Sequence, residues 1–181
     1  MSPLQSLALA LAAVAVFWML GAYNRLVALR NAVATAWQQV DAALAQRGEA
    51  VAPLVVALRD GLPGEGAALD ALVAGQARVA AAADAMRAHP VRADAAEVLV
   101  QAESGMASAS ARVLSLLDLQ ADLGADPAVA GPAAVLREAG PRLAFARQLF
   151  NDAVQTYNDA ARLWPTRLLV RLYGFGTAGR L

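Results

Sequence analysis

An uncharged apolar run near the start of the chain is the feature that most constrains its fold. Leu4 to Tyr23 are twenty consecutive residues without a charge, rich in Leu, Ala and Val. A helix of about 20 such residues crosses the roughly 30 Å hydrocarbon core of a bilayer. Trp18 and Tyr23 lie toward its end, where aromatic rings favour the headgroup layer. Residues 1–23 are therefore predicted to form an N-terminal segment and transmembrane anchor.

A cleaved signal peptide is the competing interpretation, because Leu20-Gly21-Ala22 resembles a small-residue cleavage site. Signal peptides begin with a positively charged region, and residues 1–6 contain neither Lys nor Arg. The sequence therefore favours an uncleaved anchor. The absence of Cys near the run argues against a lipoprotein.

Charges beside the run predict its orientation. Arg25, Arg30 and Arg47 follow it, whereas only the α-amino group precedes it. Because positive residues are retained on the cytoplasmic side, we expect the N-terminus outside and the C-terminal domain in the cytoplasm.

The remaining residues are balanced in charge. All 15 basic residues are Arg, and 15 acidic residues offset them. Nucleic-acid binding needs a concentrated basic face, so no nucleic-acid partner is expected. With no Cys, the chain lacks thiol nucleophiles, thiolate metal ligands and disulfides.

Apolar residues recur at steps of three and four in four stretches, which is the spacing of amphipathic helices. The four apolar seams run from Leu26 to Leu58, from Leu69 to Met86, from Leu99 to Leu116 and from Leu143 to Trp164. Such seams predict an all-α fold, an antiparallel up-and-down four-helix bundle over residues 24–164 with coiled-coil-like packing.

Gly and Pro clusters predict the ends of these helices. The expected connections are Asp60 to Gly66, His89-Pro90, Gly124 to Pro132, and the break at Pro165. Two further sites lie inside the helical patterns. Pro53 is expected to kink the first helix, and Gly140-Pro141 indicates that the fourth begins near Pro141.

The tail, residues 165–181, is predicted to be amphipathic. Four antiparallel helices return the chain to the membrane, and large apolar residues then alternate with Arg167 and Arg171. This pattern fits a short interfacial helix and equally fits a tail that seals the open bundle end. The residues expected at the membrane interface are Trp18, Tyr23, Trp164, Arg167, Leu168, Arg171, Leu172, Tyr173 and Phe175.

Two ordered motifs resemble the signatures of the LemA family. The first runs from Tyr23-Asn24 through Leu29-Arg30-Asn31 to Ala36-Trp37, Asp41, Leu44, Arg47 and Pro53-Leu54-Val55. The second runs from Ala144 through Ala146-Arg147-Gln148, Phe150-Asn151-Asp152-Ala153-Val154 and Tyr157-Asn158, and closes with Trp164-Pro165 and Leu172-Tyr173-Gly174-Phe175. Three sites depart from the family pattern: Leu54 replaces Asn, Gln120-Ala121 replaces Tyr-Pro, and Gly140-Pro141 replaces Glu-Asn.

The resemblance implies a single-anchor protein of the bacterial inner membrane with an α-helical bundle. It implies no established enzymatic activity. Relatives are often encoded beside membrane metallopeptidases or TPM-domain proteins, and one branch serves magnetosome membrane formation. A membrane-protein partner is therefore expected.

Residues that carry catalysis or bind cofactors are sparse. His89 precedes a proline in a connection, with no carboxylate at ligand spacing. The Gly61–Gly66 segment lacks the Lys-Ser/Thr end of a phosphate loop, and the Glu-x-x-His pairs of di-iron bundles do not occur. We expect no enzyme activity, no cofactor and no metal site.

The polar residues of the two motifs are the remaining candidate site: Asn24, Arg30, Asn31, Asp41, Arg47, Arg147, Asn151, Asp152 and Asn158. Arg47 and Arg147 interrupt apolar seams, so each is expected to be buried by its stem and paired, with Asp41 or Asp152 as the partner. An interhelical polar clamp or a partner-binding groove would use these residues.

The expected function is that of a non-enzymatic adaptor or scaffold for another membrane protein. The alternative is a membrane-organising or membrane-shaping protein that acts by self-association as a homo-oligomer. Both roles require the lipid bilayer as a partner.

Overall fold

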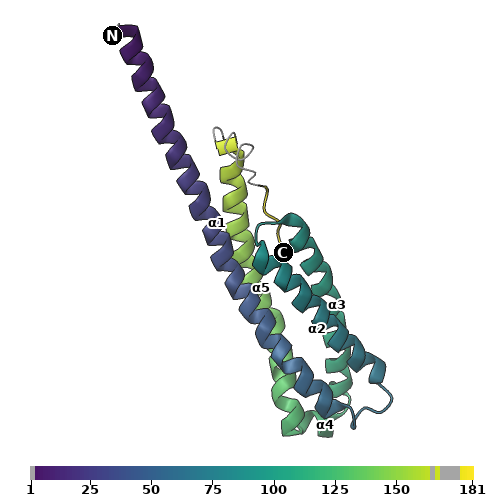
Figure 1. The fold of residues 1–181 in the computed structure, drawn as a ribbon. Helices are drawn as coiled ribbons and strands as arrows, with labels where there is room; N and C mark the ends of the chain where they lie inside the picture. The colour runs from purple at the N-terminus through teal and green to yellow at the C-terminus, as the bar shows by residue number, and fades with distance from the viewer. Residues whose placement is uncertain (1–2, 164–165, 168–175) are drawn as a thin grey trace.

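The computed structural model describes residues 3–163, 166–167 and 176–181. The described residues are all-helical, with no β-strand in those ranges, as the apolar seams predict. The helices are α1 (Pro3–Leu58), α2 (Gly66–Ala88), α3 (Ala93–Asp118), α4 (Ala121–Ala125) and α5 (Pro127–Arg162). Figure 1 shows the four long helices running alternately up and down, with α4 a single turn at one end.

Two antiparallel pairs build the bundle. α1 packs along α5, and α2 packs along α3. The α1–α5 register is fixed by an edge-to-face contact between Trp37 and Phe150, whose ring centroids lie 6.2 Å apart. Arg142 donates to Gln46 further down the same pair, at 2.8 Å. α3 and α5 make far fewer contacts with each other, which leaves a cleft between the two pairs.

α1 changes environment along its length. Its apolar first part lies outside the bundle, and the large side chains from Leu4 to Leu20 are exposed. Burial begins at Leu26, after which one face of α1 enters the core. Figure 1 shows the first part of α1 extending beyond the other helices. By length and composition this segment could cross a membrane.

The helix ends follow the Gly and Pro signals in two places and override them in others. α1 ends before the Gly61–Gly66 segment, and α2 ends before His89-Pro90. As expected, Pro53 lies inside α1, and it is on the exposed face of that helix.

The expected start of the last helix near Pro141 is wrong. α5 begins at Pro127 and runs through Pro132 and Pro141, so the connection expected at Gly124 to Pro132 lies earlier in the chain, between Asp118 and Pro127, and contains α4. Asp126 starts the helix by accepting a hydrogen bond from the Ala128 amide, and proline is favoured just after such a cap. The early turns then bury one face, which offsets the lost proline hydrogen bonds. The buried residues of these turns are Val129, Ala133, Leu136 and Ala139.

Most of the expected membrane-interface tail lies outside the described residues: Trp164, Leu168, Arg171, Leu172, Tyr173 and Phe175. Of the remaining expected interface residues, Arg167 is exposed, Trp18 lies on the exposed part of α1, and Tyr23 is half-buried where the bundle begins. Division of the chain at residues 23/24 and 164/165 remains a prediction, and α1 crosses the first boundary without a break.

Candidate functional site: the cleft between α3 and α5

The space between α3 and α5, here called the α3–α5 cleft, brings together most of the candidate polar residues that are not exposed. One half of the cleft is an open groove of about 490 Å³, lined by residues from Val100 to Leu114 of α3 and from Leu136 to Arg147 of α5. Residues 176–181, here called the tail segment, occupy the other half, between Ala93–Ala96 of α3 and Asn151–Asn158 of α5. The two halves together form one path along α5.

A buried ion pair forms the floor of the open half. Arg47 of α1 and Glu103 of α3 are 6% and 5% exposed, and both line the groove. The pair is bidentate: Arg47 Nη1 donates to Glu103 Oε2 at 3.1 Å, and Nη2 donates to Oε1. This geometry matches the planar guanidinium to the carboxylate, and it ties α1 to α3. Arg47 Nε has no hydrogen-bond partner within the described part of the chain, so the two Nη bonds carry the pairing.

The expected partner of Arg47 was wrong, although the burial and pairing of this arginine are seen. Glu103, rather than Asp41 or Asp152, neutralises it. Asp41 instead accepts hydrogen bonds from Arg87 of α2 at 2.7–3.0 Å. This contact raises the pKa of the Arg87 guanidinium, chiefly through the hydrogen bond from Arg87 to Asp41. Glu103 was not among the expected site residues, although the sequence places its charge directly beside the seam residue Ala102.

Arg147 does not meet the expectation of burial and pairing. Its side chain is half-buried at the wall of the open groove, and no ion pair to it is found among residues 3–163, 166–167 and 176–181. One turn further along α5, the side chain at the cleft wall is the uncharged amide of Asn151. Arg147 therefore adds a positive charge to the cleft instead of closing it.

Two asparagines of α5 hold the tail segment by its main chain. Asn158 accepts from the Ala178 amide at 2.8 Å and donates to the Ala178 carbonyl at 2.9 Å. Asn151 accepts from the Leu181 amide at 2.8 Å and donates to the Leu181 oxygen at 2.7 Å. Each side-chain amide thus pairs with both polar groups of one residue, as a neighbouring β-strand would.

Tyr157 adds a fifth hydrogen bond. Its hydroxyl donates to the Gly176 carbonyl at 3.0 Å, while its ring is fully buried. Burial raises the pKa of the Tyr157 hydroxyl, and the charge of Arg30 opposes that rise. The hydroxyl therefore stays a donor across the physiological pH range. Tyr157 lies on the apolar seam from Leu143 to Trp164, and periodicity alone does not reveal the polar role of its hydroxyl.

The other candidate residues of the first and last motifs stay on the surface. Asn24, Arg30, Asn31 and Asp152 are exposed. Arg30 lies close enough to Tyr157 for its charge to act on the hydroxyl. None of these four residues lines the open groove, so the expected nine-residue clamp divides into separate contacts.

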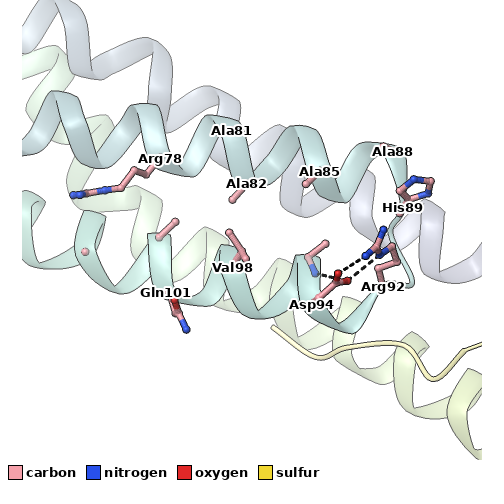
Figure 2. A pocket seen from close by; sticks show the side chains of 13 residues that line it. Arg78, Ala81, Ala82, Ala85, Ala88, His89, Arg92, Asp94, Val98 and Gln101 are labelled. Carbon is pink, nitrogen blue, oxygen red and sulfur yellow. Dashed lines mark hydrogen bonds and ion pairs between the residues drawn. The ribbon is translucent and has the colours of Figure 1, made fainter.

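A second groove lies between α2 and α3 on the outer side of that pair. It has a volume of about 860 Å³ and is lined mainly by small side chains, including Ala81, Ala85 and Val98. Figure 2 shows its polar end, where Arg92 pairs with Asp94 beside His89. The hydrogen bond from Arg92 lowers the pKa of the Asp94 carboxyl and raises that of Arg92. This groove offers an apolar surface rather than reactive groups.

Together, these features define a class of protein: a helical bundle on a long apolar helix, with a cleft between its helix pairs that the tail segment partly fills. The chain belongs to the LemA family, whose model matches residues 36–180. The match includes the first motif from Ala36 onward, all of the second motif up to Phe175, and nearly all of the tail segment. No curated protein matches the chain.

Proposed function

We propose that this protein is a membrane-anchored, non-enzymatic adaptor that holds another membrane protein at the bilayer surface. The observation that carries the proposal is the exposure of the first part of α1. Its large apolar side chains make no contact with the bundle that would bury them. Exposure of so many contiguous apolar side chains to water is strongly unfavourable, so a lipid environment is the natural counterpart. Because α1 continues unbroken into the core, the anchor and bundle are rigidly joined.

The α3–α5 cleft supports the adaptor role. It combines an apolar wall with charged and amide groups, which is the mixture that protein-binding sites use. Relatives encoded beside membrane metallopeptidases or TPM-domain proteins suggest those classes as the partner. The cytoplasmic side of a bacterial inner membrane is the proposed location, following the arginines after the anchor.

Two experiments test this function. Membranes washed with alkaline carbonate should retain the protein, and a C-terminal reporter should be active only in the cytoplasm. Affinity purification from detergent-solubilised membranes should then recover one other membrane protein in stoichiometric amount. Release by carbonate would contradict the anchor, and recovery of the chain alone would contradict the adaptor role.

A membrane-organising role through self-association is the second candidate. The α2–α3 groove supports it, because an Ala-lined face lets a helix of another copy approach closely. Large oligomers in detergent, lost when a bulky residue such as Ala85→Trp fills the groove, would favour this role over the adaptor.

A further inference from the structure

The hydrogen bonds that hold the tail segment involve its main chain and none of its side chains. All five hydrogen bonds from α5 reach main-chain atoms, at residues 176, 178 and 181. Thr177 and Arg180 point to solvent, since both are exposed. Any extended polypeptide whose backbone follows the same path could satisfy the same donors and acceptors.

The spacing of the two asparagines matches an extended chain. Asn151 and Asn158 are seven residues apart, which is two helical turns or about 10.5 Å along α5. Ala178 and Leu181 are three residues apart, and an extended chain covers about 9–10 Å over that distance. The tail segment runs antiparallel to α5, because Ala178 meets Asn158 and Leu181 meets Asn151.

Side-chain selection in the cleft falls on two or three positions. A Cβ on Gly179 would lie 2.7 Å from Ala93 Cα and 3.1 Å from the Ala93 carbonyl oxygen, so the α3 backbone admits only glycine there. Ala178 is buried, and Leu181 packs partly against the core. The accepted pattern is therefore a small residue, glycine, any residue, and an aliphatic residue.

The path of the tail segment continues beyond Leu181. On α5, Arg147 lies one helical turn before Asn151, which binds Leu181. On α3, Val100 lies one turn after Ala96, which packs near Gly179. Both Arg147 and Val100 line the open groove, so the groove begins where the tail segment ends. A ligand running in the direction of the tail would enter this groove over the Arg47–Glu103 pair. The chain's own tail therefore fills part of a longer binding path. Figure 2 shows the tail as the pale yellow trace passing beneath the start of α3.

We propose that the α3–α5 cleft is a binding site for an extended segment of a partner protein with the pattern small-Gly-x-aliphatic, and that the tail segment is its resident competitor. This inference rests on the proposed adaptor function and names the chemistry by which the partner is recognised. The tail is a suitable competitor because it buries one small side chain fully and relies on main-chain hydrogen bonds, each of which contributes little net free energy.

The test uses Gly179→Ala in the full-length protein in detergent, because this change displaces the tail without altering a cleft residue. The probe is a fluorescent peptide, Gly-Thr-Ala-Gly-Arg-Leu, which copies residues 176–181. We expect the peptide to bind the variant about tenfold or more tightly than the wild type, because the tethered competitor is removed. A control peptide with Ala in place of its second Gly should bind neither protein.

Adding Asn151→Ala and Asn158→Ala to the Gly179→Ala protein should weaken peptide binding by about tenfold or more, since four hydrogen bonds are lost. Gln155→Ala is the matched control, because Gln155 lies between the two asparagines on α5 and is exposed. It should leave binding unchanged. Lack of peptide binding to a helical, correctly melting Gly179→Ala protein at millimolar peptide would overturn the proposal.

A measurement on the wild type covers the case in which Gly179→Ala fails to fold. Hydrogen exchange at the Ala178 and Leu181 amides should accelerate when excess peptide is added, while amides in the middle of α5 keep their protection. No acceleration at saturating peptide would overturn the proposal. A third outcome is that wild-type chains form dimers, that the Asn variants abolish these dimers, and that free peptide does not bind. This outcome would overturn the proposal and would identify a second copy of the chain as the occupant.

The proposed function fails separately from this site. If peptide binds as expected but no membrane protein co-purifies, the site stands and the adaptor role falls. If a membrane protein co-purifies equally with wild type and with the Asn variants, the adaptor role stands and this site is wrong.

Discussion

The two parts of α1 have similar backbones and opposite environments. In the first part, residues such as Leu9 are apolar on every side and exposed. In the second, a stripe that includes Leu44 and Leu54 is buried while polar residues face outward. The difference shows that a helix is placed by the distribution of its apolar side chains, since a stripe selects protein contacts and an all-round apolar surface selects lipid.

Deletion of the first part should give the largest effect. Without residues 2–22, the protein should move wholly from the membrane pellet to the supernatant after alkaline carbonate treatment, because about 20 apolar residues supply the bilayer affinity. The melting of the bundle should change little, since no core residue is removed. A deleted protein that remains in the pellet would show that the second part of α1, or another helix, binds the membrane.

Arg47→Ala in the second part should destabilise the bundle by about 3–5 kcal/mol, because Glu103 would stay buried without its partner. Denaturant unfolding of the full-length protein in detergent measures this free energy. Arg59→Ala is the control, since the Arg59–Asp70 pair is 3.6 Å long and largely exposed, and it should cost less than about 1 kcal/mol.

The pairing can be separated from the packing of Arg47. Replacing both partners, with Arg47→Met and Glu103→Leu, should restore most of the lost stability, because no buried charge remains. If the double variant is as unstable as Arg47→Ala, the loss of stability comes from losing the Arg47–Glu103 interaction and not from leaving Glu103 buried without a partner.

A matched pair of leucines compares the two environments directly. Leu54→Ala should lower the free energy of unfolding by about 2–5 kcal/mol, because Leu54 is fully buried and its removal leaves a cavity. Leu9→Ala should change it by less than about 0.5 kcal/mol, since Leu9 makes no core contact and is 59% exposed. Equal effects would mean that the first part of α1 also packs on protein.

Asp41→Asn should have a smaller effect than Arg47→Ala or Leu54→Ala, about 0.2–1 kcal/mol, because the Asp41–Arg87 pair is partly exposed. Added salt should reduce the difference between wild type and variant. The pKa of Arg87 is higher in the folded protein than in the unfolded chain, so the charged guanidinium stabilises the fold. This stabilisation is complete at any pH below the pKa of the unfolded chain, and it is lost only as the pH rises through the pKa of the folded protein. Both pKa values lie far above neutral pH, so Arg87 should add no pH dependence between pH 6 and 10.

Sequence patterns sufficed where a single helix sets the outcome. The seams beginning at Leu26 and Leu69 and the breaks at Gly61–Gly66 and Pro90 predicted features that the structure has, and the uncharged run lies in a helix long and apolar enough to cross a membrane. These features depend on local periodicity and backbone chemistry, which the sequence carries directly. The error at Pro141 arose because burial of neighbouring residues along α5 outweighed a local breaker.

Only the tertiary structure decided which polar groups meet. Arg47 could have paired with any carboxylate brought near it, and the arrangement of the two helix pairs placed Glu103 of α3 within its reach. Similarly, the sequence shows that Asn151 and Asn158 are two helical turns apart on α5. Only the folded structure shows that both bind the tail segment, which lies antiparallel to that helix. Pairing across distant segments depends on helix order and register, and these are set by the packing of the whole core rather than by any one stretch of sequence.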